Sequence, residues 1–117
     1  MNIMTVDQIA IRNMLKQCWS RQSSSLWTEN NPACGQCGVT SLVIQDCFGG
    51  DILKTHLANG QLHFYNRIEN ERIDFTDEQF AEPLVYLDQL ATRAEAFADT
   101  NEAQYRYLSN AFRSIVK

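Results

Sequence analysis

The sequence has no apolar stretch that approaches the roughly 18 to 20 residues needed to cross a bilayer. Asp7, Gln8 and Arg12 interrupt the apolar pattern of the first residues, which argues against a signal peptide. There is no run of basic residues either, because the ten Lys and Arg are scattered and the net charge is −4. Nucleic-acid binding needs clustered positive charge. We therefore expect a cytoplasmic protein with neither a membrane nor a nucleic acid as partner.

Cysteine and proline are also scarce, with four and two residues respectively. In the cytoplasm the four cysteines would stay reduced, so they favour catalysis, metal binding or packing over a disulfide framework. The sequence contains no internal repeat, and its 117 residues suit a single domain, 1–117. A domain of this size can bury a core without metals or disulfides.

The first half of the sequence predicts two helices separated by a long loop. Apolar residues at helical spacing predict an amphipathic helix from an N-cap at Thr5 to about Cys18. Ser, Asn, Pro and Gly dominate residues 19–36, which we interpret as a loop that packs through its tryptophans and Leu26. Residues 37–48 are apolar around most of the helix circumference and end before two glycines. This segment is therefore the predicted central buried helix.

The second half predicts a small antiparallel sheet. Residues 51–57 have the pattern of a strand, and residues 61–68 and 71–75 have the pattern of a hairpin. The hairpin turn has either two residues, 69–70, or four, 68–71. Both turns give the same strand register, which gathers the apolar side chains of the hairpin on one face.

Helical patterns follow the hairpin. A single turn is predicted at 77–80, and longer amphipathic helices at 84–97 and 105–116 with a break at 99–101. The predicted fold is therefore α+β. A central helix packs on a three-stranded antiparallel sheet, flanked by the N-terminal helix and the C-terminal helices.

Three residues form the candidate catalytic set. Cys37 lies at the predicted start of the buried helix, where unpaired N–H groups and the helix dipole favour a thiolate. His63 and Asp74 share the polar face of the hairpin as diagonal neighbours, so Asp74 is placed to hold one ring nitrogen while the other acts as a base. A cysteine at an apolar helix start is more often only a core residue. It is the combination that favours catalysis, and its chain order suits a papain-like or transglutaminase-like core.

The stretch from Cys18 to Thr55 resembles the YunG-like family of small bacterial proteins. Its matching pieces are Trp19-Ser20, Trp27, Asn31-Pro32-Ala33, Gly35-Gln36-Cys37, Val39-Thr40, Gln45-Asp46 and Gly49-Gly50. Further similar pieces downstream are His63-Phe64-Tyr65-Asn66-Arg67, Asp74-Phe75-Thr76, Gln79-Phe80 and Arg106-Tyr107-Leu108. The resemblance covers nearly all of the chain, and the Gly-Gln-Cys block is its most distinctive part.

This resemblance implies a papain-like fold with a cysteine site, in which Cys37 is the nucleophile, His63 the base and Asp74 the orienting acid. It implies no particular substrate. Cys34 and Cys47 depart from the family pattern and are not required by it.

The predicted function is cysteine-dependent acyl transfer at a peptide or protein amide, without a cofactor or a metal. A peptidase, an amidase, a deamidase and a transferase all fit this description. Gln36 or Asn31 is a candidate to stabilise an oxyanion together with the Cys37 backbone N–H. Asn66 and Trp27 are candidates to line the cleft.

Three other functions stay open. A non-enzymatic module could keep this fold and bind a partner through the loop and its tryptophans. Cys34 and Cys37 form a CxxC pair typical of thiol-redox proteins, although no strand is predicted before it. Pro83 also precedes a helical pattern, where a thioredoxin-like fold needs a cis-proline before a strand. A zinc site would need ligands from separate elements, namely Cys34, Cys37, His56 and His63.

Overall fold

The computed structural model describes residues 7–116, which form an α+β fold with four α-helices and a four-stranded antiparallel sheet. The helices are α1 (Gln8–Cys18), α2 (Cys37–Phe48), α3 (Arg93–Ala98) and α4 (Glu102–Val116), with a short 3₁₀ helix, η1 (Asp77–Gln79). The strands are β1 (Asp51–His56), β2 (Leu62–Ile68), β3 (Glu71–Ile73) and β4 (Gln89–Ala91). None of these described helices combines the length and apolar character that crossing a membrane requires.

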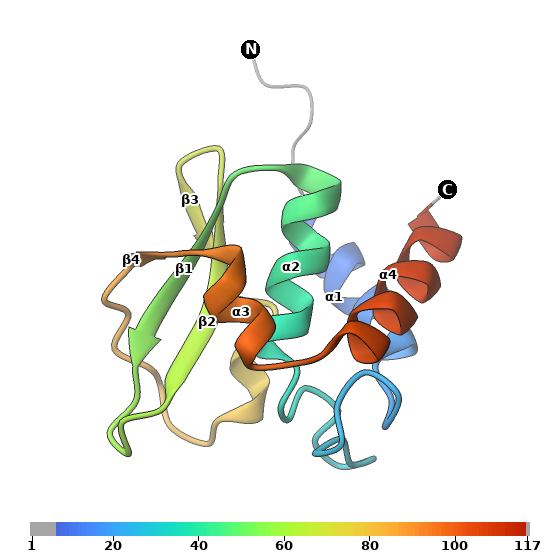
Figure 1. Ribbon diagram of the computed structural model, residues 1–117, viewed down its shortest axis with the longest axis horizontal. Helices are drawn as coiled ribbons and strands as arrows, with labels where there is room; N and C mark the ends of the chain where they lie inside the picture. Colours follow the sequence, from blue (N-terminus) through green and yellow to red (C-terminus); the bar gives the residue numbers. More distant parts are fainter. Residues whose placement is uncertain (1–6, 117) are drawn as a thin grey trace.

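Helix α2 is the centre of the molecule. It lies between the sheet on one side and the α1–α4 pair on the other, with α3 beside it (Figure 1). Every residue from Cys37 to Ile44 is buried. This is why the segment is apolar around most of its circumference, since it has neighbours on all sides. The prediction of a central buried helix with these bounds is confirmed.

The hairpin of β2 and β3 has the predicted register. Glu69 and Asn70 form its two-residue turn, and both have positive φ, 55° and 68°. Two consecutive left-handed residues define the type I′ turn, whose twist matches that of paired strands. Asn66 therefore faces Ile73, and Arg67 faces Arg72. Strand β2 also pairs with β1, from Leu62 to Arg67, so it is an interior strand of the sheet in the order β3-β2-β1-β4.

Two details of the N-terminal half differ from the prediction. Asp7 caps α1, because its carboxylate accepts the Ala10 N–H at 3.0 Å. The predicted cap, Thr5, lies outside the described residues. Trp19 is buried, and its Nε1 donates to Thr40 Oγ1 at 2.9 Å, so the long loop packs on α2 as expected. Leu26 was wrongly expected to pack, since it is 61% exposed.

The predicted helix over 84–97 is wrong, and its error accounts for the fourth strand. Residues 84–88 are irregular, β4 pairs with the outer edge of β1, and only α3 is helical. The apolar spacing was misleading because Val85 and Leu90 are exposed rather than in the core. The helix starts instead at a capping box, in which Thr92 and Glu95 satisfy each other's backbone N–H groups. Strand β4 therefore covers an edge of β1 that would otherwise be open, and the residues that form it are not helical.

Side chains of the sheet anchor the irregular segment 84–88. Thr55 is fully buried; its hydroxyl donates to Val85 O at 2.9 Å and accepts the Leu87 N–H at 3.0 Å. Tyr65 Oη lies 2.8 Å from the backbone nitrogen of Asp88 and 2.9 Å from its carboxylate. The segment therefore carries Tyr86 across the polar face of β2.

Removing the Thr55 hydroxyl should loosen this segment. We expect Thr55→Val to lower the free energy of unfolding by about 1–3 kcal/mol, because it removes the two hydrogen bonds that the buried hydroxyl makes with the main chain of Val85 and Leu87. Thr55→Ser keeps both hydrogen bonds and should retain the contact between the segment and the sheet. Urea unfolding measures the loss, and a Thr55→Val protein as stable as the parent would contradict the anchoring role.

Candidate active site

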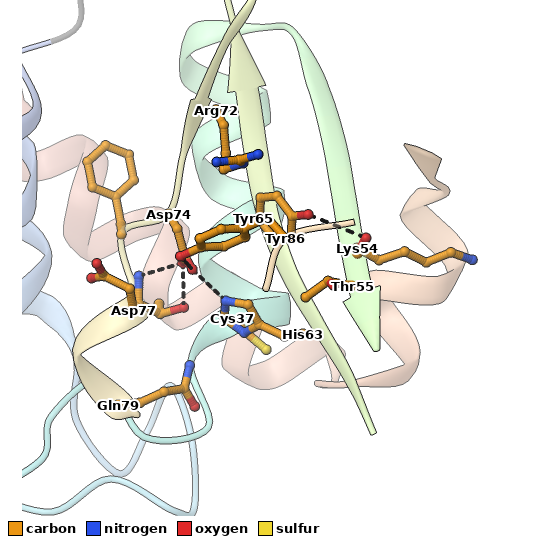
Figure 2. A network of polar contacts seen from close by, with 12 residues as sticks. Cys37, Lys54, Thr55, His63, Tyr65, Arg72, Asp74, Asp77, Gln79 and Tyr86 are labelled. Carbon is orange, nitrogen blue, oxygen red and sulfur yellow. Dashed lines mark hydrogen bonds and ion pairs between the residues drawn. The ribbon is translucent and has the colours of Figure 1, made fainter. Parts of the chain in front are cut away.

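His63 and Asp74 are in direct contact. The hairpin register puts them on the same face of the sheet, and His63 Nε2 lies 2.7 Å from Asp74 Oδ2 (Figure 2). Both side chains are buried, with His63 1% and Asp74 8% exposed. The predicted placement of these two residues as diagonal neighbours is confirmed.

The Asp74 carboxylate is surrounded by hydrogen-bond donors. Its Oδ2 also accepts the Tyr86 hydroxyl at 2.8 Å, and its Oδ1 accepts the Thr76 N–H at 3.1 Å and the Thr76 hydroxyl at 3.3 Å. Burial, and then the charge of Asp74, raise the pKa of Tyr86 far above its usual value, which keeps the phenol protonated as a donor. This donor set favours an ionised, acceptor-only carboxylate.

The carboxylate decides which nitrogen of His63 carries the proton. Since an ionised Asp74 can only accept, Nε2 is the protonated nitrogen of the neutral ring, and Nδ1 has a free lone pair. Nδ1 is buried and has no hydrogen-bond partner among the described residues. A buried ring nitrogen without a protein partner is uncommon in folded proteins, so Nδ1 is available to a ligand or a water molecule.

Arg12 of α1 holds the main chain at and after Asp74. Its guanidinium donates to the main-chain oxygens of Asp74 and Phe75 at 3.1 and 3.0 Å, and to the Asp77 carboxylate at 2.8 Å. The end of β3, η1 and α1 are thereby joined next to the buried carboxylate. Sequence reasoning did not identify this contact, because Arg12 lies 62 residues from Asp74 along the chain.

Cys37 is the first residue of α2 and is 7% exposed. Its thiol donates to Asp99 Oδ2 at 3.4 Å, and the same oxygen accepts the Gly38 N–H at 3.0 Å. Burial raises the pKa of the Cys37 thiol far above its usual value, and the Asp99 charge raises it further. The Phe64 N–H beside the sulfur acts in the opposite direction without balancing them. The thiol is therefore held protonated in this arrangement.

Asp99 was predicted only as part of a helix break. It is the C-cap residue of α3, and its Oδ2 is turned toward the start of α2 although the residue as a whole lies at the surface. Burial of the carboxyl group raises its pKa, and the hydrogen bonds from Cys37 and Gly38 oppose that shift. No sequence signal marks this contact, because an Asp near a helix end is common for capping reasons alone.

Cys37 and His63 line one cavity of about 510 Å³, a size typical of small-molecule sites. The polar or reactive residues in its lining come from distant parts of the chain: Cys34, Cys37, Gln61, His63, Gln79, Glu95 and Asp99. In Figure 2 the side chain of Gln79 is directed toward Cys37 and His63. The helix start, the strand and the loop before α2 thus converge on a single hollow.

The four predicted oxyanion or cleft residues lie outside the lining of this cavity. Gln36 is fully buried, and its Nε2 lies 3.5 Å from Ser20 O. Asn31 Nδ2 donates to Gln79 O at 3.2 Å, and Asn66 Nδ2 donates to Ser41 O at 3.0 Å. Trp27 packs against the hydrophobic core. Asn31 nevertheless contributes indirectly, because it holds the main chain of Gln79.

The residues of the CxxC pair lie together, whereas those of the alternative zinc site do not. Cys34 and Cys37 are free thiols that line the same cavity. His56 is exposed and lines a second cavity. Within residues 7–116, no three His, Cys, Asp or Glu side chains are grouped so that they could hold a metal ion.

Comparison with known proteins identifies the family. The family model described as YunG protein matches residues 7–117. The chain is also 56% identical over 102 residues to the uncharacterized protein YunG of Bacillus subtilis (strain 168), which covers 87% of this chain and 88% of that relative. The chain belongs to the YunG family. No solved structure matches it. The resemblance to the YunG-like family, inferred from pieces along nearly all of the chain, is therefore confirmed.

Loss of the Asp74 carboxylate should be costly. We expect Asp74→Ala to lower the free energy of unfolding by about 3–5 kcal/mol, because it removes the acceptor of the buried donors of His63 and Thr76 and of the half-buried Tyr86 hydroxyl. Asp77→Ala is the matched control: its ion pair with Arg12 is half exposed, so about 1 kcal/mol or less is expected. Equal losses in urea unfolding would contradict the special role of Asp74.

Removal of the Asp99 charge should ease ionisation of Cys37. Alkylation by iodoacetamide follows the thiolate fraction, so its pH profile reports the thiol pKa. Because the Asp99 charge raises that pKa, Asp99→Asn should shift the profile to lower pH. It should still lie above that of an ordinary cysteine, since burial is the larger cause. Glu95→Gln, in the same cavity, should leave the profile in place, and an unshifted Asp99→Asn profile would contradict the coupling.

Proposed function

We propose that this member of the YunG family is a cysteine-dependent acyl-transfer enzyme that acts on an amide, with Cys37 as nucleophile, His63 as base and then acid, and Asp74 as the orienting residue. One observation carries the proposal. His63, whose ring is held by the Asp74 carboxylate and whose Nδ1 has no partner among the described residues, lines the same cavity as the helix-start Cys37. Nucleophile, base and orienting acid in this relation are the recurring parts of covalent acyl transfer.

The order of the three elements also supports the proposal. A cysteine at the start of the central helix, a histidine on one strand and an acid at the end of the next is the arrangement of a papain-like or transglutaminase-like core. Here α2 supplies Cys37, β2 supplies His63, and the residue after β3 is Asp74.

The proposed reaction begins with transfer of the Cys37 thiol proton to His63 Nδ1. The sulfur then forms a bond to the carbonyl carbon, and the carbonyl oxygen takes the negative charge. Collapse of this intermediate breaks the C–N bond, and His63 gives its proton to the leaving amine. Water or a second amine attacks the thioester and gives a proton to His63, and the departing sulfur takes that proton back. Asp74 keeps the ring oriented and stabilises its cationic form throughout.

Gln79 is the proposed oxyanion donor, together with the backbone N–H of Cys37. Its side chain lines the cavity and is directed toward Cys37 and His63 (Figure 2). Its Oε1 accepts the Gly35 N–H at 3.3 Å, which orients the amide, while its buried Nε2 has no partner among the described residues. An amide donor held in this way is ready for a developing negative charge. Gln36 and Asn31, the earlier candidates, have their side-chain amides directed elsewhere.

The protonated thiol of this arrangement is a resting state in the proposal. A substrate that enters the cavity competes for Asp99, and release of the S–H from Asp99 leaves the proton free to move to His63. General-base catalysis from a protonated thiol needs such a base within reach when substrate is bound, and free-enzyme contacts are often looser.

A non-enzymatic module is the second candidate, and the burial of Cys37 is the observation in its favour. A nearly inaccessible thiol whose pKa is raised is typical of a packed core cysteine. The two candidates differ in whether Cys37 reacts in the folded protein.

Comparison of acylation with alkylation tests the enzyme and the role of Gln79 together. p-Nitrophenyl acetate should place an acetyl group on Cys37, located by mass spectrometry, and a Cys34→Ser background should not prevent it. Gln79→Ala should slow this acetylation by about 10²-fold, because an oxyanion donor is lost. Alkylation by iodoacetamide forms no oxyanion, so its rate should be nearly unchanged.

The control outcomes separate the candidates. Equal slowing of both reactions by Gln79→Ala would mean that this residue only shapes the cavity. Replacement of His63 by Gln should slow both reactions, since both need the thiol proton removed. A Cys37 that reacts with neither reagent until the protein is denatured would exclude the enzyme and favour the binding module.

A further inference from the structure

The cavity at Cys37 has an acidic lining. Two carboxylates, Glu95 and Asp99, belong to it, and no Lys or Arg among the described residues does. Glu95 is already engaged, because it forms an ion pair with Lys54 and closes the capping box with Thr92. Asp99 has no cationic partner within ion-pair distance among residues 7–116; its partners there are the neutral S–H of Cys37 and N–H of Gly38. One carboxylate at the reacting sulfur is therefore without a counter-charge.

The position of Asp99 is tightly constrained. A Cβ atom on Gly38 would lie 2.6 Å from Asp99 Oδ2 and 2.8 Å from Ala96 O, so only glycine lets the end of α3 come this close to the start of α2. The Asp99 N–H also donates to Ala96 O at 3.1 Å at the end of the helix. The carboxylate is thus held against Cys37 by the packing of two helices.

Asp99 is also accessible from outside. The hydrogen bonds of the described residues use only its Oδ2, and the residue is at the surface at the edge of the cavity. A ligand can therefore reach Oδ1 without displacing protein donors, and can take the place of the thiol proton at Oδ2.

We propose that Asp99 is the recognition carboxylate of the cavity and that the substrate carries a primary amine, bound as an ammonium group within reach of the Cys37 sulfur. This inference rests on the proposed acyl-transfer function. An ammonium group has three N–H donors and a full charge, so it binds a carboxylate better than a thiol does. Its binding at Asp99 frees the Cys37 S–H, which couples recognition to activation of the nucleophile.

The amine can belong to either reactant. As an acyl acceptor the ammonium group would lose one proton to His63 and attack the thioester carbon as the neutral amine. The nitrogen would give its second proton to the departing Cys37 sulfur as the C–N bond forms and the C–S bond breaks, and His63 would release its proton to water. As part of the acyl donor the amine would only hold that donor in place. The two sources share one recognition chemistry and differ in their effect on thioester release.

Three methanethiosulfonates of different charge test the recognition. The thiolate attacks the sulfenyl sulfur, a disulfide forms and methanesulfinate leaves, so the reagents differ only in their tails. In a Cys34→Ser, Cys47→Ser background, with rates normalised to a free thiol, the cationic 2-aminoethyl reagent should modify Cys37 about ten-fold faster than the anionic 2-sulfonatoethyl reagent, with the neutral methyl reagent between them. High salt should reduce this ratio.

Asp99→Asn should bring the ratio close to one. A change in thiol ionisation affects all three reagents equally, so the ratio isolates recognition of charge. Glu102→Gln removes the same charge from an exposed pair on α4 and should keep the preference. If Asp99→Asn does not fold, the charge preference and salt dependence of the parent protein still decide the question.

The outcomes distinguish this inference from the function on which it rests. Reaction of Cys37 that depends on His63 but shows no charge preference, or a preference that survives Asp99→Asn, overturns amine recognition and leaves acyl transfer standing. No reaction in the folded protein overturns both. With acetylated Cys37, acceleration of acetyl release by ethylamine with formation of N-ethylacetamide identifies an acceptor amine. Unchanged release together with the charge preference assigns the amine to the acyl donor.

Discussion

The buried contact between His63 and Asp74 is the interaction on which the rest of the site depends. An ionised carboxylate away from water is tolerated only when donors surround it. The chain supplies those donors from several elements: the ring of His63 on β2, the hydroxyl of Tyr86 on the irregular segment, and the N–H and hydroxyl of Thr76 before η1. The type I′ turn at 69–70 sets the register that makes the contact possible. The hairpin register and the donors on these elements together stabilise the buried Asp74 carboxylate.

The two carboxylates act differently on His63 and Cys37. Asp74 directs the free nitrogen of His63, while Asp99 and burial keep Cys37 protonated. Both conditions fit an acyl-transfer site that is inactive until a substrate displaces the thiol from Asp99. The C-cap residue of α3, Asp99, brings a second carboxylate to the Cys37 sulfur, and the absence of a side chain at Gly38 lets it approach.

The sequence was most informative where local patterns and tertiary structure agree. The bounds of α2 followed from its apolar circumference and the glycines after it, and the facing of His63 and Asp74 followed from strand alternation around a two-residue turn. Strand β4 was not predictable in the same way, because Leu90 and its neighbours repeat with helical spacing yet lie on the surface. Pairing with the open edge of β1 outweighed that local preference.

Contacts distant in sequence were the other part that pattern reasoning could not supply. Asp99 reaches Cys37 across 62 positions, and Gln79 is held by Gly35 across 44. Each depends on how helices and loops pack, and neither residue type is unusual at its position. The long loop before α2 was recognised as too apolar to be a mere connection. Its contribution to the orientation of Gln79 became evident only from the hydrogen bonds of Asn31 and Gly35.

The central claim is that Asp74 holds the proton of His63 on Nε2 and leaves Nδ1 unprotonated, as the proposed base role requires. ¹⁵N NMR of the histidine rings in the folded protein tests it most directly, because a protonated and an unprotonated ring nitrogen have well-separated shifts. The account predicts that neutral His63 is protonated at Nε2, with an unprotonated Nδ1, and that Asp74→Asn removes this preference. A neutral ring protonated at Nδ1, or a tautomer that does not respond to the change at Asp74, would contradict it.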